Sequence, residues 1–483
     1  MAGHPVRGPP VGSLRWAPPQ PHAPWSTTLP TTAFGSSCVQ GSHPTQGSED
    51  CLYLNVWAPP GATSASGLPV MVHIHGGGFF NGSGNGDNTL LANTGDEVIV
   101  SLNYRLNILG FLADSVLGAH SGDYGLQDQQ AALRWVQENI RAFGGDPHNV
   151  TIFGESAGGS SVCDQIASPT AAGLFQKAIS TSGEYNTLFG GPEAPRPAGA
   201  EDLEVQDCKS NLPTQAQANS IGASFAAAVG CAGAADVAAC LRQVPVATME
   251  QVANTPGDGY QYGGQGTIAP TLNGTTLPMT LRQALQTGAV NRVPVIAGTD
   301  RDEDLVGFPV TAAQYTQLVQ AQYGPIAGEV LALYPLSRFY SPFVAFRTVA
   351  ADSGTVCSSL LTDQALARWM PVYGYEIDNG DPPGAPTTPT GAAHVAAWDL
   401  TPTAGLDANM QVLQSQEVSD VTIFARTGNP TAQFTPTWPQ FKLGEGASQE
   451  MSLAPGGDSQ AMSVAQIELN HNCGFWDKVS PRP

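Results

Sequence analysis

The chain has 483 residues, of which 41% are hydrophobic and 12% are charged, and no apolar run reaches the length of a membrane-spanning helix. Its formal net charge of −21, from 19 basic and 40 acidic residues, gives a surface that repels phosphate backbones and anionic lipids. We therefore expect a soluble globular protein that binds no nucleic acid, built as one sheet with long insertions.

Segments of strand length and one clear helical pattern follow one another in the first third of the chain. Residues 49–59 alternate apolar and polar side chains, which predicts a half-buried strand. Buried strands are predicted over residues 69–74 and 97–102, and a helix over residues 126–140. Such alternation predicts an α/β fold, with a mostly parallel sheet flanked by helices.

Three glycines at positions 76–78 end the second of these strands and precede two phenylalanines. Without Cβ atoms, the backbone can approach a ligand closely and present its N–H groups, as an oxyanion hole requires. The alternative interpretation is a flexible turn. Because lipases and esterases place such a loop after a strand and before the nucleophile, the functional interpretation is favoured.

A strand, elbow and helix are predicted around Ser156. Residues 150–153 have β-forming character and run into Gly-Glu-Ser-Ala-Gly, and small residues that can open a helix follow. In such an elbow the serine Oγ projects above the sheet, with the helix N-terminus beneath it. The five-residue pattern alone arises by chance in a chain with 55 glycines, but its place after a strand predicts that Ser156 is a nucleophile.

A serine nucleophile needs a base to take its proton, and in α/β hydrolases the chain order is nucleophile, acid, histidine. Only His394 and His471 follow Ser156. His394 comes soon after a predicted strand over residues 371–377, where a loop from the last strands can bring an imidazole to the serine. We therefore predict His394 as the base, and we interpret His471, near the chain end, as helix capping or surface polarity.

Four carboxylates follow another predicted strand, over residues 293–297: Asp300, Asp302, Glu303 and Asp304. One of them could be the acid that orients the histidine. Spacing alone does not choose among the four, and for three of them a solvated acidic loop must be the correct interpretation.

From residue 6 to residue 478 the chain resembles type B carboxylesterases, the family that includes bacterial esterases and cholinesterases. The matching blocks are residues 49–59, 75–79, 103–106, 143–159, 174–179 and 424–430. The resemblance implies one α/β-hydrolase domain over residues 1–483, with large helical and loop insertions around the active site. It also implies an ion pair between Arg15 and Glu49.

The resemblance implies a serine carboxylic-ester hydrolase with a Ser-His-Glu triad and an acyl-enzyme intermediate, and no metal or cofactor. The family's acid stands five residues after the glycine that ends the strand, which here is Glu303. The implied oxyanion donors are the backbone N–H groups of Gly77, Gly78 and Ala157. Small-molecule or polymeric esters are the implied substrates, and we expect a monomer. Two alternatives stand beside it: a lipase-like hydrolase of longer-chain or polymeric esters, and a non-catalytic binding or adhesion relative.

Three departures from the family pattern restrict this expectation. The family's first strands, before residues 6–8, are missing, Asp304 stands where glycine usually follows the acid, and no acidic residue lies three positions after His394. None of the three removes a triad residue. Residues 39–50 lack the aromatic side chain with which cholinesterases hold a quaternary ammonium, so choline esters are not expected as specialised substrates.

The eight cysteines predict an oxidising compartment. Cys38 and Cys51 enclose twelve residues and Cys231 and Cys240 enclose eight, and such short loops suit structural disulfides, although buried free thiols are the alternative. The family's disulfides imply these two pairs together with Cys357–Cys473, which leaves Cys163 with Cys208. We therefore expect a secreted or extracytoplasmic protein, although the first residues lack the apolar core of a signal peptide.

Overall fold

The computed structural model forms two compact units. The described residues are 1–41, 46–183, 212–254, 270–301, 310–339, 341–378, 406, 408–444 and 448–479. The first unit comprises residues 1–183 and 203–293, and the second comprises residues 184–202 and 294–483. The single domain expected from the sequence stays a prediction.

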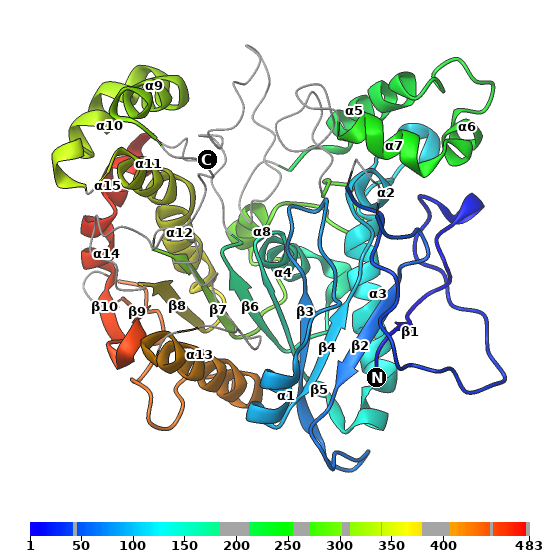
Figure 1. Cartoon of the computed structure of the whole chain (residues 1–483), viewed down its shortest axis with the longest axis horizontal. Helices are drawn as coiled ribbons and strands as arrows, with labels where there is room; N and C mark the ends of the chain where they lie inside the picture. The colour runs from blue at the N-terminus through cyan, green and yellow to red at the C-terminus, as the bar shows by residue number, and fades with distance from the viewer. Residues whose placement is uncertain are drawn as a thin grey trace. The chain divides into compact units, whose positions relative to one another are not determined.

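The first unit contains a mixed sheet with the strand order β1–β2–β4–β3–β5–β6 (Figure 1). Its strands are β1 (His4–Pro5), β2 (Tyr53–Trp57), β3 (Leu68–Ile74), β4 (Val98–Leu102), β5 (Gly145–Glu155) and β6 (Lys177–Thr181). Strands β3 to β6 pair in parallel, whereas β2 pairs antiparallel with both β1 and β4. Val70, Val72 and Val100 are wholly buried, as expected of parallel strands covered on both faces.

The strand predicted over residues 49–59 is shorter and more buried than expected. Strand β2 covers only five residues, and its polar Asn55 is as buried as its apolar neighbours. The Asn55 amide is satisfied inside the protein, because its Oδ1 accepts from Gly3 N at 2.8 Å and its Nδ2 donates to Gly84 O at 3.0 Å. The polar residue Asn55 in the alternating pattern therefore makes hydrogen bonds inside the protein and does not face solvent.

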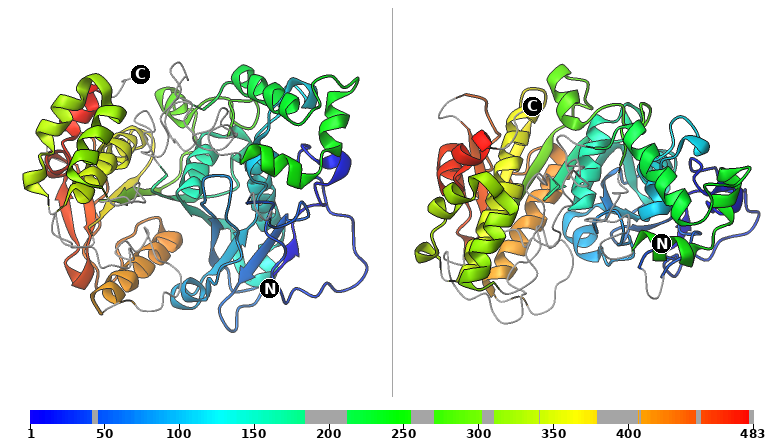
Figure 2. Two further views of the ribbon diagram at one scale, coloured as in Figure 1. Left: turned by 45° about the horizontal axis from the view of Figure 1, so that its top comes forward. Right: turned by 90° about the horizontal axis from the view of Figure 1, so that it is seen from above.

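The described part of the first unit contains eight α-helices. They are α1 (Thr89–Gly95), α2 (Asn107–Phe111), α3 (Tyr124–Asn139), α4 (Ala157–Ala167), α5 (Gln215–Ala228), α6 (Val237–Gln243), α7 (Val246–Ala253) and α8 (Leu281–Thr287). Buried glutamines join α3 to α4, since Gln165 Nε2 donates to Gln129 Oε1 and Gln130 Nε2 donates to Gln165 Oε1, both at 2.9 Å. This network holds the helix that begins immediately after Ser156. Helix α7, in green, lies beside both α2 and α5 (Figures 1 and 2).

Two ion pairs lie inside the described part of the first unit. Arg15 contacts both carboxylate oxygens of Glu49 at 2.6 and 2.7 Å, which is the pair that the family resemblance implied. Arg105 contacts Asp128 in the same two-pronged way at 2.7 and 2.8 Å, and both side chains are buried. Paired guanidinium and carboxylate groups of this geometry satisfy one another where water is excluded.

The second unit contains the strand order β7–β8–β9–β10, in which only the last pairing is antiparallel. Its strands are β7 (Val295–Asp300), β8 (Val372–Ile377), β9 (Gln449–Leu453) and β10 (Gln460–Ser463). Its helices are α9 (Ala312–Tyr323), α10 (Ala327–Leu333), α11 (Pro342–Ala351), α12 (Cys357–Leu366), α13 (Ala408–Thr427), α14 (Val464–Asn470) and α15 (Cys473–Val479), and a π-helical turn (Asp352–Val356) joins α11 to α12.

Aromatic side chains form much of the second unit's core. Tyr323 and Tyr334 both pack against Trp476, with ring centroids 5.4 and 6.1 Å apart, and Phe346 packs edge-on against Tyr315. The tyrosine hydroxyls are satisfied internally; for example, Tyr315 Oη donates to the Tyr334 carbonyl at 2.7 Å. The core therefore gains apolar area without leaving these polar atoms unpaired.

Disulfides occur within both units. The structure contains Cys38–Cys51, Cys231–Cys240 and Cys357–Cys473, the three pairs that the resemblance implied. Cys163 is also disulfide-bonded. Cys208 lies outside the described residues, so its pairing with Cys163 stays a prediction. Three disulfides agree with an extracytoplasmic location, because such bonds persist in oxidising compartments.

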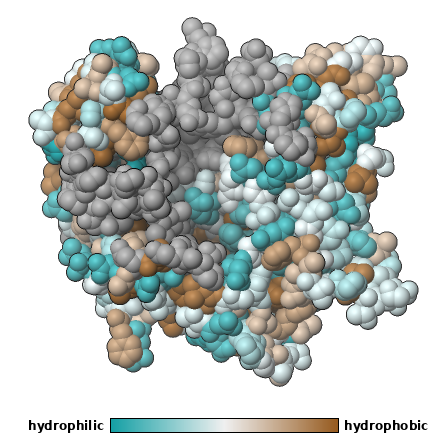
Figure 3. All heavy atoms as spheres, viewed as in Figure 1, coloured by the Kyte–Doolittle hydropathy of each residue, from teal (hydrophilic) through white to brown (hydrophobic). Residues whose placement is uncertain are grey.

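The surface shows no large separation of polar and apolar residues on the coloured part of the face in Figure 3. In the part of the chain that the structure describes, the exposed large hydrophobic residues are Val11, Trp25, Phe34, Val116, Leu361, Val412, Phe434, Leu443 and Leu469. They come from separate segments, and single exposed hydrophobic residues are normal on folded proteins. Among the described residues, no helix combines the length and apolar composition needed to cross a bilayer.

Candidate active site

The predicted elbow is present at Ser156. Strand β5 ends at Glu155, α4 begins at Ala157, and Ser156 between them has φ 56° and ψ −125°. A non-glycine residue in this left-handed region is strained, and such strain persists only where neighbours hold the backbone. Here the Ser156 N–H donates to Thr181 O, and the Ser156 carbonyl accepts from Ser160 N, both at 2.9 Å.

Glycines surround the elbow because the neighbouring backbone leaves no room for a Cβ. A Cβ on Gly154 would lie 2.5 Å from Ile74 O, and one on Gly158 would lie 2.1 Å from the same oxygen. A Cβ on Gly159 would lie 2.6 Å from Thr181 O. The pattern Gly-x-Ser-x-Gly therefore records how closely α4 packs against the ends of β3 and β6.

The three-glycine loop lies directly against the elbow. A Cβ on Gly76 would be 2.6 Å from Glu155 O and 3.3 Å from the Cβ of Ser156. Gly77 and Gly78 follow with φ values of 102° and 63°, which glycine adopts without strain. The structure thus brings together two features that the sequence separates by about 80 residues: the glycine run and the serine.

His75 holds the first peptide of this loop. Burial lowers the pKa of His75 to about 4, so its ring is neutral at neutral pH. Its Nδ1 lies 2.8 Å from the Gly76 carbonyl oxygen, which can only accept, so Nδ1 carries the proton. Because the C=O of Gly76 and the N–H of Gly77 belong to one peptide plane, fixing the first orients the second. Tyr104 stacks on the His75 ring at 4.3 Å and donates its hydroxyl to the His75 carbonyl.

Two further contacts hold the far end of the loop. The Gln40 amide binds the Gly82 backbone twice, donating to its carbonyl at 2.9 Å and accepting from its N–H at 3.0 Å. The Phe79 carbonyl accepts from the N–H of Asn107 at 2.7 Å. The loop is therefore fixed from the Cys38–Cys51 segment on one side and from α2 on the other. These supporting residues were not predicted from the sequence.

The predicted acid and base are not among the described residues. Glu303 and His394 both lie outside them, as do Asp302 and Asp304. Asp300, the fourth candidate acid, is described: it is the buried last residue of β7. The structure therefore describes the nucleophile and the proposed oxyanion loop, but not the triad geometry.

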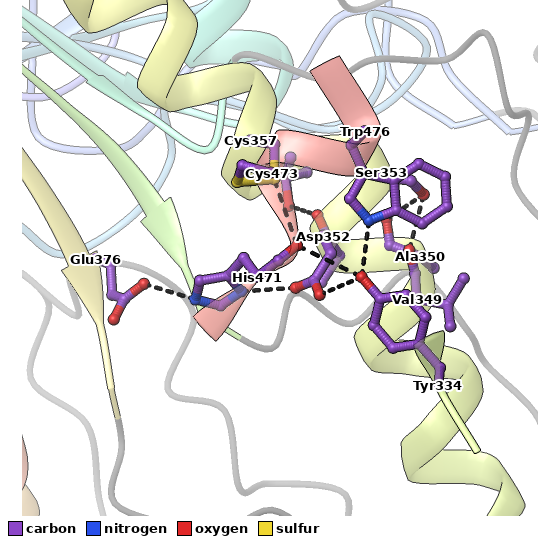
Figure 4. Close-up of a disulfide and its surroundings, with 12 residues drawn as sticks. Tyr334, Val349, Ala350, Asp352, Ser353, Cys357, Glu376, His471, Cys473 and Trp476 are labelled. Carbon is purple, nitrogen blue, oxygen red and sulfur yellow. Dashed lines mark hydrogen bonds and ion pairs between the residues drawn. A yellow bond between two sulfur atoms is a disulfide. The ribbon is translucent and has the colours of Figure 1, made fainter. Parts of the chain in front are cut away.

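The interpretation of His471 as surface polarity is wrong. Although His471 follows α14, its side chain is buried between two carboxylates, Asp352 and Glu376 (Figure 4). Asp352 Oδ2 also accepts from the hydroxyl of Tyr334, which in turn accepts from Trp476 Nε1, both at 2.7 Å. His471 therefore belongs to an internal ionic cluster of the second unit.

The described residues contain no group of three or more His, Cys, Asp or Glu side chains that could hold a metal ion.

Comparison with known proteins decides the family. The family model described as "Carboxylesterase family" matches residues 5–324. The chain belongs to the carboxylesterase family.

Individual carboxylesterases match over most of the chain. A para-nitrobenzyl esterase from Bacillus subtilis is 34% identical over 91% of this chain and 88% of its own length. A fumonisin B1 esterase from Sphingopyxis macrogoltabida is 34% identical over 78% of this chain and 67% of its own length. A solved structure titled PNB esterase superposes with a TM-score of 0.75 and 29% identity, covering 98% of this chain and 95% of that one. This carboxylesterase therefore has the α/β-hydrolase fold and hydrolyses carboxylic esters, as the resemblance implied.

Proposed function

We propose that this carboxylesterase works by two-step acyl transfer with Ser156 as the nucleophile. His394 takes the proton of Ser156 as its Oγ attacks the ester carbonyl, and Glu303 orients the imidazole and stabilises its charged form. The alcohol then leaves with the proton that His394 took. Water gives a proton to His394 as it attacks the acyl-enzyme, and His394 returns that proton to Ser156 as the acid product leaves. The proposal for Glu303 and His394 rests on their places in the family pattern.

The oxyanion of the tetrahedral intermediate is held by backbone N–H groups of Gly77, Gly78 and Ala157 in this proposal. The observation that carries it is the close approach of Gly76 to Ser156, since a Cβ on Gly76 would lie 3.3 Å from the serine Cβ. Ala157 is the first residue of α4, so its N–H has no partner within the helix. Donors held in place before the reaction lower the barrier without further reorganisation.

Ser156→Ala tests the nucleophile, and Ser160→Ala is the matched control. Both remove one hydroxyl at the start of α4, but the Ser160 hydroxyl donates to Gly183 O at 2.8 Å and has no part in the proposed chemistry. We expect Ser156→Ala to lose ester turnover and labelling by a fluorophosphonate, while Ser160→Ala keeps both. More than a few per cent residual turnover in purified Ser156→Ala would contradict the proposal.

The names of the relatives suggest where to look for substrates. They are named as esterases of a para-nitrobenzyl ester and of fumonisin B1, so esters of these two kinds are proposed as substrates for this chain. A panel of p-nitrophenyl, aryl, phthalate and polyester substrates tests this range. A chain-length series separates the esterase from the lipase-like alternative, because a lipase gains activity with long acyl chains.

Secretion and a monomeric state are also proposed. The disulfides support secretion, since they need an oxidising compartment to persist. Detection of active enzyme in the culture medium of the native host tests secretion, and sedimentation equilibrium tests the monomer.

A further inference from the structure

Helix α2 fixes the Phe79 end of the proposed oxyanion loop. Phe79 has φ 62°, a strained value for a non-glycine residue, and its carbonyl accepts from the N–H of Asn107 at 2.7 Å. Its ring packs edge-on against Phe111 at 5.2 Å. Because Asn107 and Phe111 are the first and last residues of α2, any shift of α2 moves Phe79 and the adjoining Gly78.

Asn107 is held in turn by a carboxyl group from α7. Asn107 is buried and has φ 48°, a value that asparagine adopts more readily than most residues. Its Nδ2 lies 3.5 Å from Oε2 of Glu250, at the outer limit of a hydrogen bond. The same Glu250 oxygen accepts from Asn254 Nδ2 at 3.1 Å. Glu250 thus connects α7 to the first residue of α2.

Glu250 is an unusual group to bury, because no cation of the described residues compensates it. It is wholly buried, and its Oε1 has no hydrogen-bond partner in the same part of the chain. Helices α2 and α5 pack against α7, and neither contains a titratable residue. Burial raises the pKa of Glu250 to about 7, against the opposing effect of the Asn254 and Asn107 amides. A buried carboxyl that reaches the proposed oxyanion loop through Asn107 is a candidate for a functional role.

We propose that Glu250 and Asn107 are positioning residues for ester hydrolysis. Glu250 holds the amide of Asn107, and the N–H of Asn107 then holds the Phe79 carbonyl, so that the Gly77 and Gly78 donors face the oxyanion. This inference rests on the proposed oxyanion hole. The oxyanion forms only in the transition state, so misplaced donors lower kcat and leave KM nearly unchanged.

Three variants separate positioning from simple stability. Asn107→Gly keeps the left-handed backbone and removes the amide, Glu250→Ala removes the carboxyl, and Glu250→Gln keeps an acceptor of the same reach. We expect the first two to lower kcat on p-nitrophenyl butyrate by roughly 10- to 100-fold, with KM within about threefold of wild type. Glu250→Gln should stay within about threefold of wild-type kcat, and Glu138→Gln, at an exposed site on α3, controls for the loss of a charge.

Rates are expressed per site labelled by exhaustive fluorophosphonate treatment, and thermal melting is recorded for each variant. Lower melting temperatures with unchanged kcat per labelled site in Asn107→Gly and Glu250→Ala would overturn the inference. So would a Glu250→Gln variant as slow as Glu250→Ala. If the fluorophosphonate labels wild type elsewhere than at Ser156, the proposed function fails and the inference fails with it. If wild type is labelled at Ser156 but Asn107→Gly and Glu250→Ala keep the wild-type kcat, the inference fails and the proposed function stands.

Discussion

His471 Nδ1 lies 2.6 Å from Oδ1 of Asp352, with both side chains buried. On the other side of the ring, Nε2 lies 3.0 Å from Oε2 of Glu376. Burial alone would lower the pKa of His471, but the charges and hydrogen bonds of the two carboxylates outweigh it and raise this pKa well above its usual value. His471 is therefore an imidazolium at neutral pH, and it neutralises part of the buried negative charge.

His471→Gln should strongly destabilise the protein. The substitution removes the only cation of the described cluster and leaves two buried carboxylates facing each other, which in comparable pairs costs about 3–5 kcal/mol. Urea unfolding of the variant, against the exposed control His148→Gln, measures the loss. A variant as stable as wild type at pH 7 would contradict the charged state assigned to His471.

The ion pairs of His471 with Asp352 and Glu376 predict a pH dependence of the free energy of unfolding. Because the folded pKa of His471 is raised, its contribution is fully present below the ordinary pKa of 6.5 and is lost as the pH rises through the folded value. The stability gap between wild type and His471→Gln should therefore narrow at alkaline pH. A gap that widens from pH 7 to pH 10 would show that the sign is wrong.

The two histidines after Ser156 should separate cleanly by activity. His394→Gln should lower kcat/KM by orders of magnitude with little change in melting temperature, because it removes the general base. His471→Gln should lower the melting temperature strongly and, at a temperature where it stays folded, leave kcat/KM nearly unchanged. If His471→Gln were inactive and His394→Gln active, His471 would be the general base and His394 would not.

Glu303→Gln tests the acid. Loss of the charge that stabilises the imidazolium should lower kcat/KM by orders of magnitude, while Asp302→Asn and Asp304→Asn should each cost less than about tenfold, or roughly 1.4 kcal/mol of barrier. Asp300→Asn is a less well matched control, since Asp300 is buried at the end of β7. If Asp302→Asn or Asp304→Asn lowered kcat/KM by orders of magnitude while Glu303→Gln stayed nearly normal, the acid would be that aspartate and not Glu303.

Glu250→Gln should stabilise the protein near neutral pH. Burial raises the folded pKa of Glu250 from 4.5 to about 7, so the folded state binds more protons than the unfolded state between these values and loses stability as the pH rises. The glutamine variant escapes this loss, which is at most about 3 kcal/mol. Urea unfolding at pH 4.5 and at pH 8 should show a relative gain only at the higher pH; an equal difference at both would contradict the assigned ionisation.

Peptide mapping without reduction tests the last disulfide. Cys163 is bonded in α4, and we expect its partner to be Cys208. Recovery of a Cys163 peptide joined to any other cysteine would contradict this pairing.

Short-range features of the fold were predictable from the sequence. Apolar runs located β3, β4 and β8, and the glycines near Ser156 located the elbow, because each signal lies within a few neighbouring residues. The acid could not be chosen among four nearby carboxylates without the family resemblance. His471 was misassigned because its partner Asp352 lies 119 residues away, and the polar residues beside it give no sign of burial. Glu250 and Asn107 were missed for the same reason, since their contact spans 143 residues.

The Cys357–Cys473 disulfide, with a sequence separation of 116, bears on how the protein is made. On the ribosome, residues 357 and 352 emerge long before residues 473 and 471, so the core of the second unit cannot close during most of its synthesis. The first unit, with its glycine loop and Ser156 close to one another in the earlier part of the chain, can begin folding first. A Cys357 thiol that waits for its partner is then open to mispairing, which makes correct oxidation late in folding a step on which the yield of active enzyme depends.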